Sequence, residues 1–393
     1  MPSELPLTTL LQAALLACFA LVAYNYVVYP LLVIGLARLR PAVNPPKLPP
    51  DPGRWPRVSL VIAAYNEERV IDGKIRNSLA LDYPRDRLEI ITVSDGSADR
   101  TPDIVLSFAD QGVVGLHDPP RRGKSSALNR GVARAAGDIV VFSDANNDFA
   151  PDALRVLVRH FADPAVGGVC GVKQIKPADD RQSTQGDSMY WRYESAIKQA
   201  EGRLGSITNA DGEIFAIRRR LYRPLDERII NDDTQITFDL VNQGYRVLYD
   251  PAARSYEYAS SHIRDDFYVK VRMVAGGFQS LAWNARMFLP PRRAFTLAFV
   301  SHKVLRWTAP LPLLGLLGLS AALSHRPLYA ALLGAQVVFY ATAAWGAWAI
   351  RRRPLPTVVY VPFYFSVMNL AALMGLWRFL SGRQGTHWRK AAR

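Results

Sequence analysis

Polar side chains able to carry chemistry follow the apolar segment 139–142 of this 393-residue chain. Asp144 and Asn146 offer one carboxylate and one neutral oxygen at a spacing of two residues. Magnesium favours one or two carboxylates and completes its shell with phosphate oxygens and water. The pair therefore predicts a divalent-metal site that binds a diphosphate. The alternative is that Asp144 only caps the next helix.

A basic segment, Arg121-Arg122-Gly123-Lys124-Ser125, lies at the start of a helix predicted over 124–136. Backbone N–H groups at a helix start and a lysine ammonium both attract phosphate. The segment predicts a phosphate contact at Lys124, and a solvated basic turn is the alternative.

Two adjacent acids, Asp232 and Asp233, precede a helix that contains Ile236 and Leu240 and ends at Gly244. A carboxylate held there can act as a general base on a hydroxyl group. Helix capping needs only one of the two acids, so Asp232 can be structural.

The segment 264–285 has apolar residues at steps of four, three, four and three, at positions 267, 271, 274, 278 and 281. This spacing is typical of an amphipathic helix, which we expect to lie in a membrane interface. Arg272 lies off the apolar stripe, where it faces either a leaving diphosphate or a solvated surface.

The elements that must position these side chains alternate between strand and helix. Apolar strands are predicted at 58–63, 88–93, 113–116 and 139–142, with helices between them. Continuously apolar strands of this kind predict an α/β fold with a mostly parallel sheet covered on both faces. Ligands bind beyond the carboxyl ends of such strands. Three of these ends carry Tyr65-Asn66-Glu67, Asp95-Gly96-Ser97 and Asp144-Ala145-Asn146.

Two common nucleotide motifs are missing from the sequence. No GxGxxG follows the first strand, which disfavours a dinucleotide fold of the dehydrogenase kind, and no GxxxxGK[ST] is present, which disfavours a P-loop. The two cysteines, Cys18 and Cys170, lie far apart in different contexts, which excludes a disulfide-stapled secreted protein.

The composition indicates a globular part joined to a membrane part. Apolar residues make up 49% of the chain and the mean hydropathy is 0.00, while 10% aromatic residues exclude disorder. Residues 10–36 carry no charge and are long enough to cross a bilayer. Basic residues follow them, so the positive-inside rule places the N-terminus outside and the next domain in the cytosol. The start lacks the features of a cleaved signal peptide.

Three more apolar runs occupy the C-terminal third, at 308–323, 328–350 and 358–380. We expect four spans in total. Prolines weaken the start of the last run, so a shallow or re-entrant segment is the alternative there. The net charge of +14 is concentrated beside these runs, where membrane orientation explains it, and a nucleic-acid partner is therefore rejected.

These signals divide the chain into five parts. They are an N-terminal transmembrane helix (1–40), a proline-rich linker (41–56), a cytosolic catalytic domain (57–262), an amphipathic interface helix (263–290) and a C-terminal membrane region with a basic tail (291–393).

The order of these motifs resembles the inverting family 2 glycosyltransferases, which have a GT-A fold. It is most similar to the membrane-embedded cellulose, hyaluronan and poly-N-acetylglucosamine synthases. The resemblance covers about residues 57–285. It rests on the strings at 58–68, 93–99, 121–129, 142–146, 212–219 and 231–234.

The resemblance implies a role for each matching residue. The uridine of a UDP-sugar would be held by Glu67 and Asp95, its diphosphate by Lys124, and Mg²⁺ or Mn²⁺ by Asp144 and Asn146. Asp233 would deprotonate the acceptor hydroxyl, and Asp211 and Gly212 match the loop on the acceptor side. Trp191 can supply a sugar-stacking face or can simply anchor its helix on the sheet.

Two departures from the family pattern affect the function. The metal motif of the family usually ends in Asp, where this chain has Asn146. Processive members carry Gln-x-x-Arg-Trp, where this chain keeps Arg272 but has Val269 and Met273. The missing tryptophan favours a transferase that adds one sugar to a lipid-linked acceptor over a polymerase.

The resemblance and the membrane runs together imply an integral protein of a bacterial-type plasma membrane. Its expected partners are a nucleotide-sugar donor, a glycan or lipid-linked acceptor and the lipid bilayer, and an export partner is unknown. The leading hypothesis is transfer of a hexose or N-acetylhexosamine during polysaccharide synthesis. A non-catalytic membrane scaffold is the hypothesis from another class.

Overall fold

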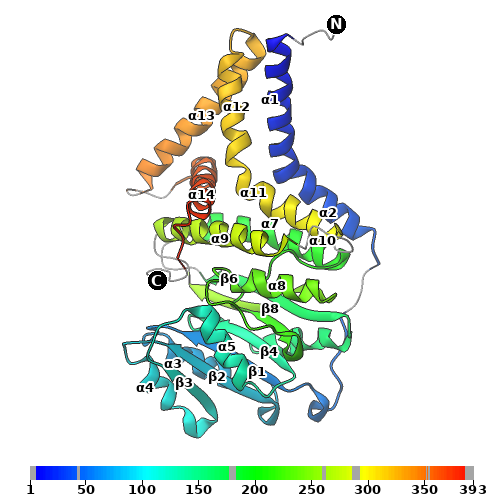
Figure 1. Cartoon of the computed structure of the whole chain (residues 1–393), viewed down its shortest axis with the longest axis vertical. Coiled ribbons are helices and arrows are strands. Elements are labelled where there is room, and N and C mark those ends of the chain that lie inside the picture. The colour runs from blue at the N-terminus through cyan, green and yellow to red at the C-terminus, as the bar shows by residue number, and fades with distance from the viewer. Residues whose placement is uncertain are drawn as a thin grey trace.

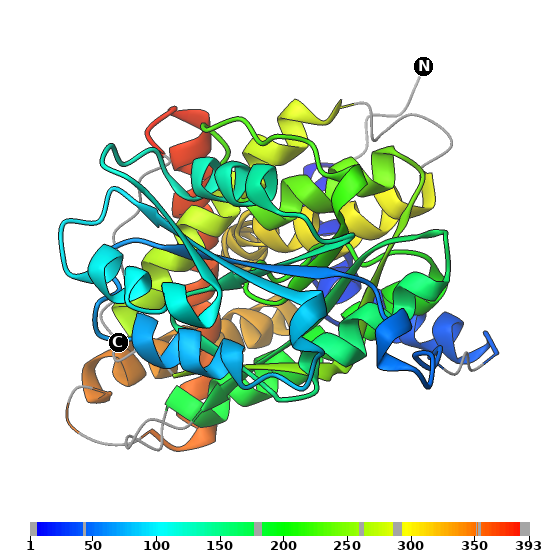
Figure 2. The same ribbon diagram turned by 90° about the horizontal axis from the view of Figure 1, so that it is seen from below.

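The computed structural model describes residues 6–41, 45–176, 183–258, 263–285, 293–350, 352 and 355–385. An α/β domain forms one end of the molecule and a group of long helices forms the other, with horizontal helices between them (Figure 1). Seen from below, the α/β domain lies in front of the long helices (Figure 2).

Eight strands form one sheet in the order β3-β2-β1-β4-β7-β6-β8-β5. Their bounds are β1 Val58–Ala64, β2 Leu88–Asp95, β3 Val113–Asp118, β4 Ile139–Asp144, β5 Asn147–Phe149, β6 Val166–Lys176, β7 Phe215–Arg218 and β8 Arg246–Tyr258. The four strands predicted from the sequence are β1 to β4, and they pair in parallel. Beyond β4 the sheet is mixed: β4–β7, β6–β7 and β5–β8 are antiparallel, while β6 and β8 pair in parallel. The α/β class is therefore confirmed, with a mixed second half that the sequence patterns did not reveal.

Helices cover both faces of this sheet, as continuously apolar strands require. Leu60 and Ile62 of β1 pack with Ile71 and Ile75 of α3 (Ile71–Leu79) on one face. Val61 packs on the other face with residues of α5 (Lys124–Arg134). The remaining helices of the domain are α4 (Thr101–Leu106), α6 (Ala153–Val158), α7 (Ser183–Leu204) and α8 (Asp232–Asn242). The two cysteines are free, as expected from their separation.

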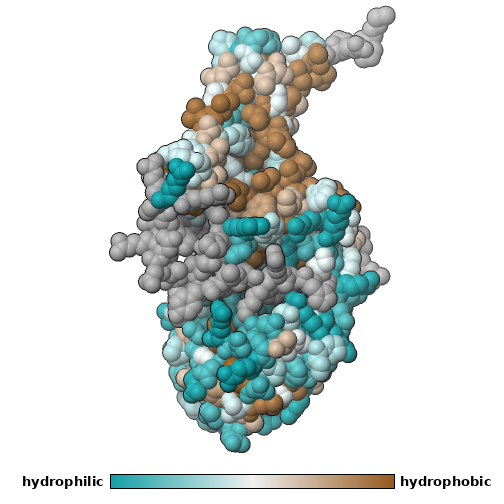
Figure 3. All heavy atoms as spheres, turned by 90° about the vertical axis from the view of Figure 1, so that its left-hand side faces the viewer, coloured by the Kyte–Doolittle hydropathy of each residue, from teal (hydrophilic) through white to brown (hydrophobic). Residues whose placement is uncertain are grey.

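Three helices in the described part of the chain are long and apolar enough to cross a membrane, judged by length and composition. They are Leu7–Arg38, α13 (Pro327–Ala349) and α14 (Thr357–Leu380). A fourth candidate is bent by 53° between residues 293–308 and α12 (Pro310–Ala322). Apolar side chains gather on the surface of this end, whereas the α/β domain is mostly hydrophilic (Figure 3).

Two π-helical turns lie side by side within this region. The first candidate span consists of α1 (Leu7–Ala23), the π-turn η1 (Tyr24–Val28) and α2 (Tyr29–Arg38). The second π-turn is η8 (Val300–Val304), between α10 (Arg293–Phe299) and α11 (Leu305–Thr308). Tyr24 Oη lies 2.9 Å from Ser301 Oγ, and Asn25 Nδ2 donates to the carbonyl of Leu305 at 3.2 Å. The first and last thirds of the chain are thus joined at two irregular turns.

A buried ion cluster joins these turns to α7. It consists of Glu194 and Glu201 from α7 with His302, Lys303 and Arg306. The two ring nitrogens of His302 lie 2.8 Å from Glu201 Oε1 and 3.1 Å from Glu194 Oε2. The histidine and both acids of the cluster are at most 4% exposed. Charges desolvated to this degree persist only when they are paired, so the cluster fixes how α7 meets the segment 293–308 of the bent candidate span.

The amphipathic helix predicted at 264–285 is α9 (Ile263–Trp283). Val274 and Phe278 of its stripe pack against α14, where the ring of Phe278 stacks on Phe379 with centroids 5.6 Å apart. In Figure 1, α14 is seen almost end-on, whereas α1 and α12 run along the length of the molecule. The last apolar run therefore crosses the direction of the other long helices and lies on α9.

Candidate active site

Lys124 brings together two of the motifs singled out in the sequence. Its ammonium lies 2.7 Å from Asp144 Oδ1 and 3.6 Å from Asp232 Oδ2. Burial by itself would lower the pKa of this ammonium, but Asp144 and then Asp232 outweigh burial and raise the pKa. Lys124 therefore stays charged between the end of β4 and the start of α8.

Asp233 begins α8 beside this lysine, and its carboxylate accepts a hydrogen bond from the backbone N–H of Thr234 at 2.6 Å. Burial, followed by repulsion from Asp232, raises the pKa of Asp233 to about 6, and Lys124 opposes the rise. A carboxylate with a pKa near the working pH is suited to general-base catalysis. The N-cap of α8 is Asn231, and no side-chain cap hydrogen bond is formed, so neither acid is the capping residue of this helix.

Gly212 leaves room for this arrangement. A Cβ atom placed on it would lie 3.3 Å from Asp232 Oδ2, 3.3 Å from Asp233 Cβ and 3.6 Å from Lys124 Nζ. The loop predicted on the acceptor side therefore touches the predicted base and the predicted diphosphate contact.

Arg272 points to the same place from α9. Its Nη1 donates to the carbonyl of Ile230 at 3.3 Å. Burial lowers its pKa, while Asp232, Asp233 and Asp144 raise it. The guanidinium therefore lies in the field of the site acids and not on a solvated face.

The position of Arg272 depends on close packing between α9 and the loop before α8. Asn231 Nδ2 donates to the carbonyl of Met273 at 2.8 Å. A Cβ on Gly276 would lie 2.6 Å from Asn231 Oδ1, so only glycine allows this approach. The amphipathic pattern predicted the helix, but a hydrogen bond and a glycine determine its docking.

Asp95 is 4% exposed, and its carboxylate is occupied by the loop that leads to Lys124. It accepts hydrogen bonds from the backbone of Gly123 at 2.7 Å and Arg122 at 3.3 Å, and from Arg130 Nη2 at 2.7 Å. Gly123 has φ +99°, a conformation that glycine adopts without strain. Asp95 therefore holds the loop that carries Lys124, and the contact with uridine that the resemblance implied for it stays a prediction.

Glu67 lies half-buried in the loop between β1 and α3. Its backbone N–H donates to Thr101 Oγ1 at 2.8 Å, and its carbonyl accepts from Ile71 at the start of α3. The preceding Asn66 has φ +52° and accepts a hydrogen bond from the backbone of Ala98 at 2.8 Å. These hydrogen bonds join the loop after β1 to the segment after β2, next to the loop that carries Lys124.

The side-chain amide of Asn146 is hydrogen-bonded through its nitrogen. Its Nδ2 donates to Glu257 Oε1 at 2.9 Å. An ionised carboxylate can only accept hydrogen bonds, so the NH₂ group must face Glu257 and the amide oxygen is turned away.

The oxygen donors at this edge of the sheet suit magnesium or manganese. Asp144 and the amide oxygen of Asn146 can supply two oxygens, and a diphosphate would supply others. No group of three or more His, Cys, Asp or Glu side chains that could hold a metal occurs among the described residues. The donors are therefore few, as Asn146 in place of Asp suggests.

Trp191 belongs to α7 and lies near the same edge. Lys173 Nζ is 5.8 Å from the centroid of its ring and forms ion pairs with Glu213, at 3.0 Å, and Glu257. Because Glu257 also binds Asn146, this cluster links Trp191 to the predicted metal site. Sequence reasoning missed Lys173 and Glu257, which belong to no motif, and it gave no role to Glu213, although this residue lies in the string at 212–219.

Asp211 also has a partner that the sequence did not reveal. Its Oδ1 lies 2.7 Å from the ammonium of Lys198, which is 3% exposed, and its backbone N–H donates to Cys170 Sγ at 3.1 Å. The negative charge of Asp211 contributes to the raised pKa of Asp233. The structure therefore brings Asp211, Gly212, Lys124, Asp144, Asp232, Asp233 and Arg272 to one edge of the sheet.

Comparison with known proteins agrees with this geometry. Residues 59–225 match the model of the family described as glycosyl transferase family 2. The probable glycosyltransferase YdaM of Bacillus subtilis is 35% identical over 228 residues, which cover 54% of this chain and 53% of that protein. The poly-beta-1,6-N-acetyl-D-glucosamine synthase of Staphylococcus aureus is 27% identical over 234 residues, which cover 57% and 55%. The chain spans about half the length of the curated relatives that it matches.

A solved structure covers much more of the chain. The mannosyltransferase PcManGT from Pyrobaculum calidifontis, in complex with GDP-Man and Mn²⁺, superposes with a TM-score of 0.73 and 25% sequence identity. The match covers 95% of this chain and 100% of that structure. Residues 59–225 are therefore similar to family 2 glycosyltransferases, and the domain that contains them has the GT-A fold, next to helices long and apolar enough to cross a membrane.

Proposed function

We propose that this protein is an inverting glycosyltransferase that transfers a hexose or N-acetylhexosamine from a UDP-sugar to a glycan acceptor at a membrane. The observation that carries the proposal is the position of Lys124, whose ammonium lies between Asp144 and Asp232 with Asp233 alongside. The site thus combines positive charge for a leaving diphosphate with a base for an acceptor hydroxyl.

The residues divide the reaction between them. Asp233 accepts the proton of the acceptor hydroxyl as its oxygen attacks the anomeric carbon. The bond from that carbon to the diphosphate oxygen breaks, and attack from the opposite face inverts the configuration. Lys124 and Arg272 offset the negative charge of the departing diphosphate.

A divalent cation belongs to this proposal as well. Asp144 and the amide oxygen of Asn146 would hold it, and it would supply Lewis-acid stabilisation of the diphosphate. Support comes from PcManGT, whose structure contains Mn²⁺ and a nucleotide sugar. The choice between Mg²⁺ and Mn²⁺ is a matter for titration.

Transfer of a single sugar to a lipid-linked acceptor is the second candidate function. At the position where processive family members carry tryptophan, Met273 is 38% exposed and its carbonyl is bonded to Asn231. No aromatic ring is offered there to hold a growing chain. This favours a short product over a polymer.

The arrangement of α14 suggests how the protein sits in a bacterial-type plasma membrane. If α14 lies along the interface on α9, the C-terminal segment that follows it stays on the cytosolic side with the catalytic domain. The positive-inside rule then holds for this end of the chain as well. Accessibility of an added cysteine at Arg383 to an impermeant thiol reagent, in a background without Cys18, tests this placement.

The function is tested with the full chain in lipid nanodiscs and a panel of UDP-Glc, UDP-GlcNAc and GDP-Man, with Mg²⁺ or Mn²⁺. Nucleotide release identifies the donor, and sizing of labelled product separates polymer from a single addition. Asp233→Asn should abolish release, whereas Asp239→Asn, on the same helix but away from the site, should not. Release from no donor, or full activity of Asp233→Asn, would contradict the proposal and favour a scaffold.

A further inference from the structure

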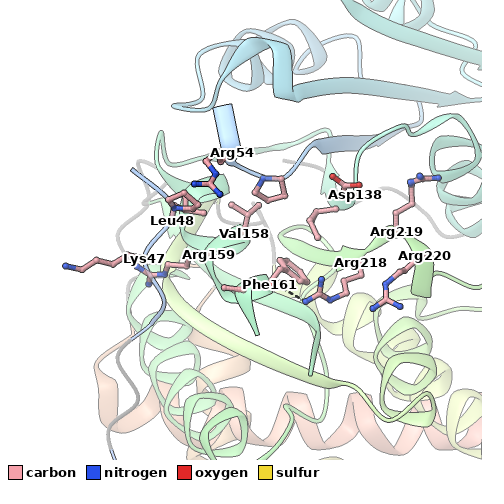
Figure 4. A pocket seen from close by; sticks show the side chains of 14 residues that line it. Lys47, Leu48, Arg54, Asp138, Val158, Arg159, Phe161, Arg218, Arg219 and Arg220 are labelled. Atoms are coloured by element: carbon pink, nitrogen blue, oxygen red, sulfur yellow. Dashed lines mark hydrogen bonds between the residues drawn. The ribbon is translucent and has the colours of Figure 1, made fainter. Parts of the chain in front are cut away.

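A pocket of about 480 Å³ opens at the opposite edge of the sheet from the candidate active site (Figure 4). It lies beside the amino ends of β1 and β4, whereas Asp144 ends β4. The six residues of β4, at about 3.3 Å per residue, place the two edges roughly 20 Å apart. The pocket is therefore separate from the donor site.

One wall of the pocket is formed by residues 47–56, before β1, and this segment is docked on the α/β domain at Trp55. Trp55 is 8% exposed, and its Nε1 donates to the carbonyl of Pro49 at 2.8 Å. Arg87 donates to the carbonyl of Trp55 at 2.8 Å, and the guanidinium of Arg155 lies 5.3 Å from its ring centroid. The pocket is thus a feature of the folded chain, with the linker as a fixed side.

Positive charge dominates the lining. Among the lining residues, Asp138 is the one acid. Six are basic: Lys47, Arg54, Arg159, Arg218, Arg219 and Arg220. Asp138 already accepts a hydrogen bond from the backbone of Arg57. The linker cations Lys47 and Arg54 lie on one side of the pocket and Arg218 and Arg220 lie on the other (Figure 4).

Two of these arginines, Arg218 and Arg159, are held in place by bonds to other protein groups. Arg218 donates to the carbonyls of Val166, Phe161 and Asp163, and Arg159 pairs with Asp250 at 2.6 Å. The other four cations are exposed, and none forms an ion pair with a residue that the structure describes. Of these four, Arg219 donates through Nε to the carbonyl of Gly137 at 2.7 Å, and the guanidinium of Arg220 lies 5.7 Å from the ring centroid of Tyr245. Lys47, Arg54 and Arg220 therefore remain as exposed cations without a charged partner among the described residues.

Like charges are crowded at the end of β7. Burial and then the nearby charge of Arg220 lower the pKa of Arg218. The charge of Arg159 is already paired with Asp250. An anion in the pocket would offset the crowded charge of Arg218 and Arg220.

The geometry points to a second ligand site, for a small molecule with two or more phosphate groups and an apolar portion of nucleotide size. Arginines bind phosphate through paired N–H donors, which suits the charged rim. Leu48, Val158 and Phe161 offer an apolar floor. The volume is in the range of ordinary small-molecule sites. A ligand here would touch the linker and the α/β domain together.

Binding of pyrophosphate and of ADP to the full chain in phosphatidylcholine nanodiscs, measured by calorimetry with EDTA present, tests this assignment. The double variant Arg54→Gln/Arg220→Gln should lose roughly tenfold or more in affinity, because two charge-assisted contacts are removed. Arg85→Gln/Arg134→Gln, which neutralises two exposed arginines elsewhere, should bind as the wild type does.

Two further arms separate this site from the donor site and from a protein partner. Lys124→Met should retain the binding that the pocket variant loses, and the pocket variant should release nucleotide at the wild-type basal rate. The assignment is overturned if the pocket variant binds both probes normally. It is also overturned if polyglutamate binds at the pocket while pyrophosphate and ADP do not, since that indicates an acidic peptide.

Discussion

The candidate active site and the buried ion cluster both gather acids and bases, but they use them differently. In the cluster, Glu194 and Glu201 face three basic side chains and are almost inaccessible. In the site, Asp144 and Asp232 share the single ammonium of Lys124. Asp233 lies close to both Asp232 and Lys124. The cluster satisfies its acids, whereas the site leaves one acid short of positive charge.

The pKa values of the acids record this difference. Burial would raise the pKa of Glu194, but His302 and then Lys303 reverse this and hold it well below its usual value. The pKa of Asp233 is raised instead, to about 6. Complete pairing therefore stabilises a joint between helices, while incomplete pairing leaves Asp233 with the raised pKa that the proposed general base requires.

The largest expected effect is on turnover at the site. Asp233→Asn should lower kcat by about 10²–10⁴-fold, because the acceptor loses its general base. The melting temperature should stay the same or rise, since an acid with a raised pKa is destabilised in its ionised form at pH 7. Activity and thermal unfolding measured on one preparation check both parts, and a large loss of stability would contradict the assignment.

The matching change in the cluster should affect stability first. Glu194→Ala should destabilise the fold by about 3–5 kcal/mol, because it leaves buried cations without their partner. Denaturant unfolding in nanodiscs measures this. Glu227→Ala, an exposed acid, is the control and should have little effect. Equal stability of the two variants would show that the cluster does not hold α7 in place.

Lowering the pH should separate the two regions. Asp233 must be ionised to act, so activity should fall as the pH drops through about 6. Glu194 and Glu201 have lowered pKa values, so the stability they contribute is present above the ordinary carboxylate range and is lost only below it. Circular dichroism and initial rates over pH 4 to 8 should therefore show activity lost before structure. Simultaneous loss would refute the comparison.

The smallest expected effect concerns metal affinity. Asn146→Asp alone should give little gain, because the new carboxylate would face Glu257. Combined with Glu257→Gln, it should lower the Mn²⁺ concentration needed for half-maximal activity. The coupling between the two changes should be about 0.5–3 kcal/mol. Purely additive effects would mean that Glu257 does not orient residue 146.

The first half of the sheet was predictable because local patterns determine it. Four continuously apolar strands and their polar ends identified the edge where Asp144 and Asp95 lie. The second half was not, because the antiparallel pairing of β7 depends on contacts between distant segments. The same holds for the cluster, where Glu194 and Arg306 are separated by 112 residues.

Within the site, motifs located residues but did not give their orientation. The string at 93–99 marked Asp95, yet its carboxylate binds the loop at Gly123. The periodicity of α9 left Arg272 with two readings, and the short approach at Gly276 decided between them. Partners such as Glu257 and Lys198 belong to no motif, so their roles follow only from three-dimensional proximity.

The π-turn η1 makes the first candidate span sensitive to its length. Tyr29, Val33 and Ala37 of α2 pack against α7, and they face it because the π-turn contains one residue more than an α-helical path would. Deleting one residue there would rotate this face by about 100°. A chimaera that exchanges the first candidate span must therefore preserve the residue count between Tyr24 and Arg38, because a replacement of equal hydropathy with a different count there would turn the wrong side of α2 towards α7.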